Sequence, residues 1–124
     1  YKAMLEGVGY GINQHFEIFD AKQMGTKKVM AVGGGTKNPV WLQAVSDISG
    51  KRQYVAEVET GAAYGDALIA ALTTGRYKDC AELAQNIRIA RAIEPSEEHY
   101  KAYAGGRERY AALYQTTKGI MHSY

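Results

Sequence analysis

Residues 28–39 read Lys28-Val-Met-Ala-Val-Gly-Gly-Gly-Thr-Lys-Asn-Pro39, in which a short apolar run leads through a glycine triplet into a helix start. The apolar run to Val32 predicts a buried strand, and the three glycines predict a tight loop. Asn38 is a favoured N-cap and proline belongs at the first helical position, so a helix is expected from Pro39. This strand, loop and helix form the most informative unit of the sequence.

The flanking segments extend the unit in both directions. Residues 1 to about 19 predict an amphipathic helix, because apolar side chains recur at steps of three and four, namely Leu5, Val8, Ile12, Phe16 and Phe19. The helix from Pro39 ends at Gly50, as at a C-cap, and its apolar face comprises Val40, Trp41, Ala44, Val45 and Ile48.

A second strand and a third helix follow. Gln53-Tyr-Val-Ala56 predicts the strand, and Thr60-Gly61 predicts the start of a helix that Gly75 stops. The side chains expected to face inward from this helix are Ala63, Ala67, Leu68, Ala71 and Leu72. A helix that joins two strands normally makes them a parallel pair with a right-handed crossover. The order helix–strand–helix–strand–helix therefore predicts the α/β fold class, with two strands evident.

Three glycines, Gly7, Gly9 and Gly11, interrupt the first helix, and each costs about 1 kcal/mol of helix propensity relative to alanine. Glycines at such positions indicate that another backbone or a ligand approaches closely. We favour tight packing of this helix against a sheet, and the approach of a ligand stays open as the alternative.

Residues 79–124 predict a helical tail. Asp79 to about Ile87 is expected to form a short helix, Arg91-Ala-Ile93 is compatible with an extended segment, and Ser96 begins a helix with acids in its first turn. A row of side chains follows on one helical face, with a weak point at Gly105-Gly106; the row is Tyr100, Tyr103, Arg107, Tyr110 and Tyr114. We interpret this row as a docking face against the body of the protein rather than as a binding platform.

The bulk composition narrows the class of protein. Of the 124 residues, 46% are hydrophobic and 23% are charged, as in a soluble globular domain, and apolar runs are far shorter than the roughly 18 residues of a membrane span. Cys80 is the single cysteine, which favours a reducing compartment, the cytoplasm. The net charge of +2 is too small to indicate nucleic acid, so neither a nucleic acid nor a membrane is expected as a partner. A cluster of basic residues fits a solvated face as well as an anionic ligand; it comprises Lys22, Lys27, Lys28, Lys37, Lys51 and Arg52.

The glycine triplet is the candidate binding site. Backbone N–H groups in a glycine loop before a helix favour anionic or polar ligand groups, and the missing side chains permit close approach. The spacing lacks both the third glycine of G-x-G-x-x-G and the Gly-Lys-Ser/Thr of a P-loop, which disfavours those two classes. The histidines His15, His99 and His122 have no ligand spacing, so no metal site is predicted.

Several short motifs occur in order along the first part of the chain. They are Leu5-Glu6-Gly7-Val8, Val29-Met-Ala-Val-Gly-Gly-Gly-Thr-Lys-Asn-Pro39, Trp41-Leu-Gln43, Ser46-Asp47, Glu57-Val-Glu59, Ala62-Ala63, Gly65-Asp-Ala67 and Ala70-Ala71. At these spacings the series resembles the C-terminal region of the FGGY carbohydrate kinases, and most closely their xylulokinase-like branch, from about Ala3 to Gly75. Asp66, where small residues are commoner, and the glycines of the first helix depart from the family pattern and bear on sugar specificity more than on fold.

The resemblance implies the C-terminal part of an actin-like (ribonuclease H-like) ATPase domain. Residues 1–78 would be the C-terminal portion of the nucleotide-binding domain, with residues 79–124 as the tail that packs on it. The cofactor implied is ATP, with Mg²⁺ held mainly by residues outside this chain, as are the catalytic aspartate and the sugar-binding residues. No catalytic residue is therefore assigned within the chain.

The resemblance also assigns the nucleotide site. Gly33, Gly34 and Gly35 form the loop that passes close to the adenosine, and Asn38 matches the position that hydrogen-bonds adenine in the related glycerol kinases. A role of Asn38 as a helix N-cap alone stays open, and Gln43 is expected to give packing support.

Two functions stay open. The first is the ATP-binding portion of a kinase that phosphorylates a ketose or polyol, such as a pentulose. The second is a non-catalytic nucleotide-binding or regulatory module of the same fold. The expected partners are the N-terminal remainder of the kinase, a sugar bound mainly outside this chain, and further copies in a homo-oligomer.

The isolated 124-residue chain is expected to show no sugar-dependent ATPase or kinase activity, because its motifs include no general base, magnesium ligand or phosphate clamp. Phosphorylation of xylulose, ribulose and glycerol by the purified chain is the measurement. Phosphorylation of any of these three substrates by the chain would contradict this prediction.

Overall fold

The computed structural model describes residues 1–26, 28–58 and 61–123. Its elements run in the order α1 (Lys2–Ala21), β1 (Val29–Ala31), the 3₁₀ turn η1 (Gly34–Lys37), α2 (Pro39–Ser49), β2 (Gln53–Ala56), α3 (Gly61–Thr73), α4 (Cys80–Gln85), β3 (Ile89–Ile93), α5 (Glu97–Ala102) and α6 (Ala104–Met121). The predicted order helix–strand–helix–strand–helix is confirmed. Lys27, Glu59 and Thr60, which entered the sequence predictions, lie outside the described residues. In the described part of the chain, no helix is both long and apolar enough to cross a membrane.

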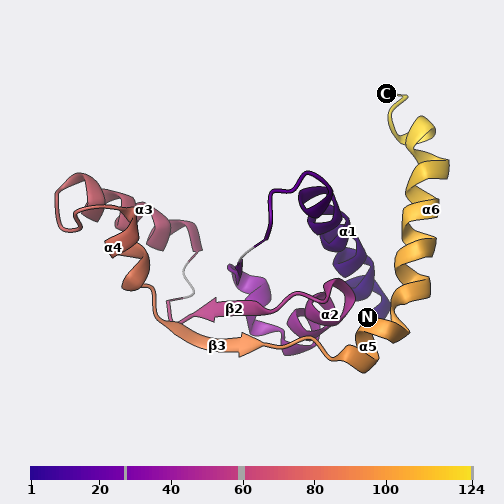
Figure 1. The fold of residues 1–124 in the computed structure, drawn as a ribbon, viewed down its shortest axis with the longest axis horizontal. Helices are drawn as coiled ribbons and strands as arrows, with labels where there is room; N and C mark the ends of the chain where they lie inside the picture. Colours follow the sequence, from indigo (N-terminus) through magenta and orange to yellow (C-terminus); the bar gives the residue numbers. More distant parts are fainter. Residues whose placement is uncertain (27, 59–60, 124) are drawn as a thin grey trace.

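The sheet has three strands in the order β1-β2-β3, which corrects the expectation of two. Strands β1 and β2 are parallel, as the intervening helix predicted, and β3 pairs antiparallel with β2. The extended segment predicted around Arg91 is this third strand, so the tail that was expected to be helical contributes to the sheet (Figure 1). The predicted boundary at residue 78 stays a prediction.

The core is centred on α2, which lies between α1 and the sheet. Its buried apolar residues and one strand residue make up the core: Leu42, Ala44, Val45, Ile48 and Val55. Both predicted ends of α2 are confirmed. The Asn38 side chain accepts a hydrogen bond from the Trp41 N–H at 3.2 Å, and Gly50 adopts φ +67°, the left-handed conformation that glycine favours. Val40, predicted on the apolar face, is instead exposed.

The glycines of α1 serve contacts with helices, not with a sheet as we expected. A Cβ on Gly9 would lie 2.8 Å from the Ile48 side chain of α2, so glycine is what allows the two helices to approach. A Cβ on Gly11 would lie 3.2 Å from the Tyr110 hydroxyl of α6, whereas Gly7 faces no described atom within 4 Å. Two of the three glycines therefore fix how α1 packs.

The tyrosine row docks α6 onto α1, as predicted. Tyr103 donates from its hydroxyl to the Glu6 carboxylate at 2.8 Å, and Tyr10 stacks on Tyr110 with ring centroids 5.8 Å apart. Burial, followed by the hydrogen bond to Glu6, raises the pKa of Tyr103 to about 12, so the phenol remains a donor at neutral pH. The helix breaks at Tyr103, just before the predicted weak point at Gly105-Gly106, and Gly106 lies within α6, where it leaves room for the Tyr10 hydroxyl.

Helices α3 and α4 form an arm that extends away from the rest of the molecule (Figure 1). Helix α3 has no buried residue among those described, although its sequence predicted an inward face. Ala63 and Ala67 are exposed, and Leu68, Ala71 and Leu72 are only half-buried. Ile69 remains 62% exposed. The apolar composition of α3 therefore finds little to pack against in this chain.

We expect the isolated chain to self-associate at low micromolar concentration, because α3 and both edges of the sheet leave apolar surface and strand hydrogen-bonding groups without cover in the described residues. Sedimentation velocity is the measurement. A compact, fully folded monomer at this concentration would contradict the expectation.

Candidate functional site

The glycine loop lies where β1 ends, at the carboxyl edge of the parallel pair β1–β2. Ligands in open α/β sheets bind at this edge, because the loops between strands and helices gather there. Gly33 has φ +86° and ψ −173°, a backbone conformation that only glycine adopts without strain. The chain then turns through η1 and enters α2 at Pro39. Glycine at this position is thus a requirement of the backbone path.

Gly34 and Gly35 differ in what surrounds them. A Cβ built on Gly34 would meet no described atom within 4 Å, so the loop is open on that side. A Cβ on Gly35 would lie 2.4 Å from the Trp41 ring, so this glycine lets the indole pack directly on the backbone. Of the predicted triplet, Gly34 therefore presents bare backbone to solvent and Gly35 faces the interior.

Hydrogen bonds hold the turn in shape from several sides. Thr36 donates from its N–H at 3.1 Å and from its hydroxyl at 2.7 Å to the carbonyl of Gly33. Asn38 donates from its N–H to the Gly35 carbonyl at 3.0 Å. The Arg91 guanidinium of β3 donates to the Thr36 carbonyl. The loop is consequently a braced turn rather than a free glycine hinge.

Asn38 uses both ends of its amide within the protein. The oxygen caps α2 at the Trp41 N–H, and the amide nitrogen donates to the Tyr1 hydroxyl at 2.7 Å. An amide nitrogen has two N–H donors and an amide oxygen has two lone pairs. The N-cap role is therefore confirmed, and among the described residues the side chain uses one of its two donors and one of its two lone pairs.

The basic residues predicted as a cluster are distributed over several contacts. Lys51 pairs with Asp20 at 2.8 Å, and Arg52 pairs with Glu94, whose pKa the hydrogen bond from Arg52 lowers below its ordinary value. Lys28 lies 5.1 Å from the centre of the Tyr54 ring. Lys37 remains exposed at the end of η1, beside the loop. The solvated-face interpretation fits most of these residues better than a single anionic site does.

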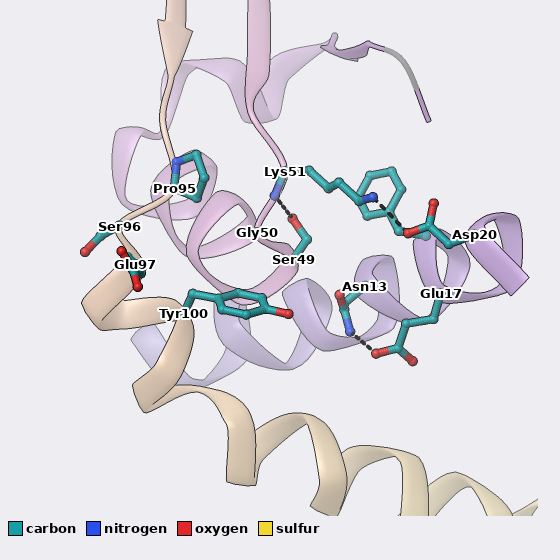
Figure 2. A pocket seen from close by; sticks show the side chains of 11 residues that line it. Asn13, Glu17, Asp20, Ser49, Gly50, Lys51, Pro95, Ser96, Glu97 and Tyr100 are labelled. Carbon is teal, nitrogen blue, oxygen red and sulfur yellow. Dashed lines mark hydrogen bonds and ion pairs between the residues drawn. The ribbon is translucent and has the colours of Figure 1, made fainter. Parts of the chain in front are cut away.

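A hollow lies at the C-terminal end of α2, away from the glycine loop, where that helix meets α1 and α5 (Figure 2). It has a volume of about 450 Å³ and is lined by Asn13, Glu17, Asp20, Lys51 and Tyr100, among others. The polar groups here are already engaged with each other, since Asn13 donates to Glu17 at 2.7 Å and Lys51 pairs with Asp20. The sequence predicted no site at this place.

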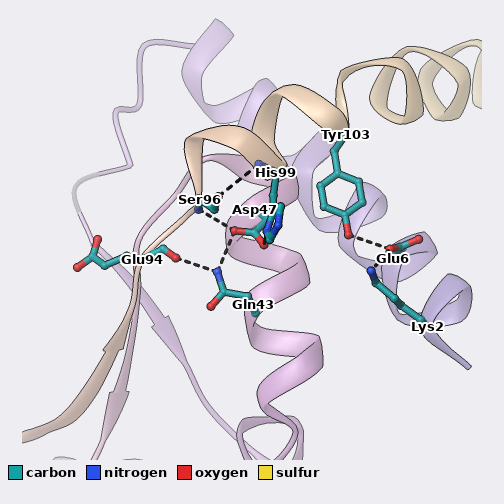
Figure 3. Close-up of polar contacts among 8 residues, drawn as sticks. All are labelled: Lys2, Glu6, Gln43, Asp47, Glu94, Ser96, His99 and Tyr103. Carbon is teal, nitrogen blue, oxygen red and sulfur yellow. Dashed lines mark hydrogen bonds and ion pairs between the residues drawn. The ribbon is translucent and has the colours of Figure 1, made fainter.

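Asp47 is the centre of a buried polar network that the sequence did not reveal (Figure 3). Its carboxylate is buried and accepts hydrogen bonds from the Gln43 amide at 2.8 Å, the Ser96 N–H at 2.8 Å and the His99 ring at 2.9 Å. Gln43 also donates to the Glu94 carbonyl at 2.9 Å, which bears out its expected packing role. These bonds join α2 to the start of α5. The sequence predicted Gln43 as packing support and Ser96 as a helix start, but it did not predict that Asp47 and His99 would join them.

Comparison with known proteins decides the family. The model of the FGGY family of carbohydrate kinases, C-terminal domain, matches residues 1–74. The chain belongs to this family. A xylulose kinase from Bacillus subtilis (strain 168) is 32% identical over 120 residues, which cover 96% of this chain and 24% of that protein. The predicted resemblance, including its xylulokinase-like branch, is thereby confirmed.

Solved structures confirm the fold of this FGGY chain. A xyloylose kinase from Brucella ovis aligns with a TM-score of 0.79 and 27% identity, over 94% of this chain and 24% of that one. A xylulose kinase from Rhodospirillum rubrum aligns with a TM-score of 0.78 and 24% identity, over 97% and 25%. The chain thus spans about a quarter of the length of the relatives that it matches. Its mixed α/β arrangement is that of the C-terminal portion of these kinases.

No group of three His, Cys, Asp or Glu side chains within the described ranges could hold a metal ion. Among the acidic residues, Asp47 is buried and already accepts hydrogen bonds from three donors of the protein. The candidate site of this chain is therefore a backbone turn beside the Asn38 side chain, whose amide makes one hydrogen bond as donor and one as acceptor. Such a site can bind and orient a ligand, and it offers no group that takes up a proton.

Gly33→Ala is expected to lower the free energy of unfolding by about 1–3 kcal/mol, because alanine is strained at the φ and ψ of Gly33. Gly34→Ala is the matched control. It adds the same methyl group where a Cβ meets no described atom, so its effect should stay within about 0.5 kcal/mol. Denaturant unfolding of the two variants is the measurement, and equal effects would contradict the geometry of the turn.

Proposed function

We propose that this chain is the ATP-binding C-terminal portion of a sugar kinase that phosphorylates a ketose or polyol, and specifically a pentulose such as xylulose. Family membership supports phosphoryl transfer to a sugar. The substrate class follows from the relatives, since several of them carry the name xylulose kinase at about 30% identity. Because the chain spans a quarter of these proteins, the proposal concerns the intact kinase, of which this chain is one part.

The observation that carries the nucleotide site is the open side of the glycine loop. Gly33 and Gly34 expose backbone with no described atom within 4 Å of their Cβ positions, at the carboxyl edge of a parallel strand pair. A planar base and its ribose can approach bare backbone more closely than a surface covered with side chains. Gly35 has no such freedom, because it packs on Trp41. We therefore assign adenosine contact to Gly33 and Gly34, with Gly35 as support.

Asn38 lies four residues beyond Gly34 and is half-buried at the same end of α2. Its remaining N–H and lone pair can pair with the edge of adenine, which presents one donor and ring-nitrogen acceptors. The N-cap bond fixes the amide while it does so. One side chain thus serves both roles that the sequence left open.

The chain contributes positioning to the reaction. ATP supplies the γ-phosphoryl group, and the sugar hydroxyl accepts it in a reaction that needs metal and charge stabilisation around the phosphates. We place the metal, the general base and the sugar contacts in the rest of the kinase, because this chain spans only about a quarter of its relatives. Holding the adenosine end fixed keeps the phosphates aligned for transfer.

Gly34→Val in the intact kinase is expected to raise the KM for ATP by tenfold or more and to leave the KM for the sugar within about twofold. A branched side chain would occupy the space that the adenosine requires, and its Cβ would meet no described atom of the fold within 4 Å. Steady-state kinetics with each substrate varied in turn is the measurement.

Gly119→Val is the matched control for this variant. It makes the same substitution near the end of α6, where a Cβ is equally unhindered and far along the chain from the loop. It should change neither KM. A well-folded Gly34→Val enzyme with an unchanged KM for ATP would show that the nucleotide binds elsewhere.

A further inference from the structure

Arg91 connects the third strand to the glycine loop. Its guanidinium donates a hydrogen bond to the carbonyl of Thr36, a residue that is 55 positions away in sequence and only 2% exposed. Thr36 is the central residue of the turn, since its own N–H and hydroxyl close the loop onto Gly33. The hydrogen bond from Arg91 therefore holds the glycine loop that we assign to the nucleotide.

In a 3₁₀ turn the carbonyl of Thr36 would normally accept a hydrogen bond from the backbone N–H three residues later, and this N–H is missing here. Along η1, N–H groups bond to carbonyls three residues earlier, as Asn38 does to Gly35. The next bond in that ladder would run from residue 39 to Thr36. Residue 39 is proline, which has no N–H, and Asn38 has already turned to an extended conformation with φ −103° and ψ 98°. The Arg91 guanidinium is a side-chain donor that reaches this carbonyl, where the N–H of residue 39 is missing.

The register of the sheet explains why Arg91 reaches the loop. Arg91 lies directly opposite Val55 in the antiparallel pair, and Val55 is 1% exposed on the face that α2 covers. Residues opposite each other across a ladder share a face of the sheet, so Arg91 projects toward the α2 side. The register shifts between Val55 and Ala56, so Ala90 is an extra residue beside Arg91. Bulges of this kind commonly re-aim a side chain next to a functional site.

We propose that Arg91 is a positioning residue for ATP, acting through the Thr36 carbonyl to hold Gly33 and Gly34 in the shape that receives adenosine. The inference rests on the proposed nucleotide site. Thr36 is shielded from water whereas Arg91 is exposed, and a charged donor makes a stronger hydrogen bond to a carbonyl than a neutral donor does. Arg91 touches the turn and not the reacting atoms, so its effect belongs to nucleotide binding.

Kinetics of the intact kinase test the proposal. Arg91→Ala is expected to raise the KM for ATP roughly tenfold and to leave the KM for the sugar within about twofold. Arg91→Lys keeps a cationic donor, so it should recover part of the loss, with a KM for ATP raised about threefold. A contribution to general stability alone would lower the amount of active enzyme without separating the two KM values.

Arg52→Ala is the matched control. Arg52 also ties β2 to the end of β3, through Glu94, but its contacts lie away from the loop. This variant should leave both KM values within about twofold of the unmodified enzyme. If Arg91→Ala does not fold, Arg91→Met, which keeps a long side chain but has no donor, takes its place, and an unchanged KM for ATP in that enzyme overturns the proposal.

Gly34→Val, measured alongside, distinguishes a failure of the Arg91 proposal from a failure of the proposed nucleotide site. If Gly34→Val raises the KM for ATP and a folded Arg91→Ala does not, the loop binds the nucleotide and Arg91 has no positioning role. If neither variant changes the KM for ATP, the nucleotide site itself is misplaced and the proposal for Arg91 falls with it. A parallel rise in both KM values for Arg91→Ala also overturns the positioning role.

Discussion

Helix α2 is buried on nearly all sides from Leu42 onward, and the elements around it supply the hydrogen-bond partners that its buried polar groups require. From Leu42 to Ser49 every residue except Gln43 is buried, and the set includes polar groups at Ser46, Asp47 and Ser49. Buried polar groups cost free energy unless they are hydrogen-bonded. Their partners therefore determine what can surround the helix.

Those partners come from three separate elements. The Ser46 hydroxyl accepts from the Gln53 amide of β2 at 2.9 Å and lies 3.3 Å from the Ile93 carbonyl of β3. The Asp47 carboxylate receives the Ser96 N–H at the start of α5 (Figure 3). The apolar side is closed by α1, which can approach because Gly9 has no side chain to meet Ile48. Since Asn38 caps this fixed helix, the glycine loop is attached to the best-supported element of the chain.

The sequence predicted those features that depend on local chemistry. The strand of residues 29–31, the caps at Asn38 and Gly50, and the helix start at Ser96 each follow from side chains within a few residues of the feature, and each is present. The positions of Gly33 and Gly34 in an open turn also follow from the local run of glycines. Local propensity and spacing were sufficient for these predictions.

Features that depend on distant partners were not accessible in the same way. Strand β3 has mostly exposed residues and lacks the alternation of a half-buried strand, so the sequence indicated an extended segment around Arg91 but not its pairing with β2. Helix α3 is apolar enough to predict an inward face, but none of its described residues is buried. The Asp47–His99 and Arg91–Thr36 contacts span 52 and 55 positions, and neither residue type signals its partner by spacing. The signal that could have indicated Arg91 is the proline at position 39, which removes a donor that the turn requires.

The loop that we assign to ATP is therefore not a property of its own sequence alone. The family model ends at residue 74, yet the groups that brace the loop and its helix include Arg91, Ser96 and His99 from beyond that point. Gly33 and Gly34 supply the open backbone, which by itself is a conformationally permissive segment that loses much entropy when it is ordered. Bonds from β3 and α5 hold that segment and α2 in place before a ligand arrives, and preorganisation of this kind lowers the cost of binding. If the loop binds nucleotide as we propose, a substitution in the C-terminal part of the chain will alter the affinity without contacting the ligand, through the carbonyl of Thr36 or the carboxylate of Asp47.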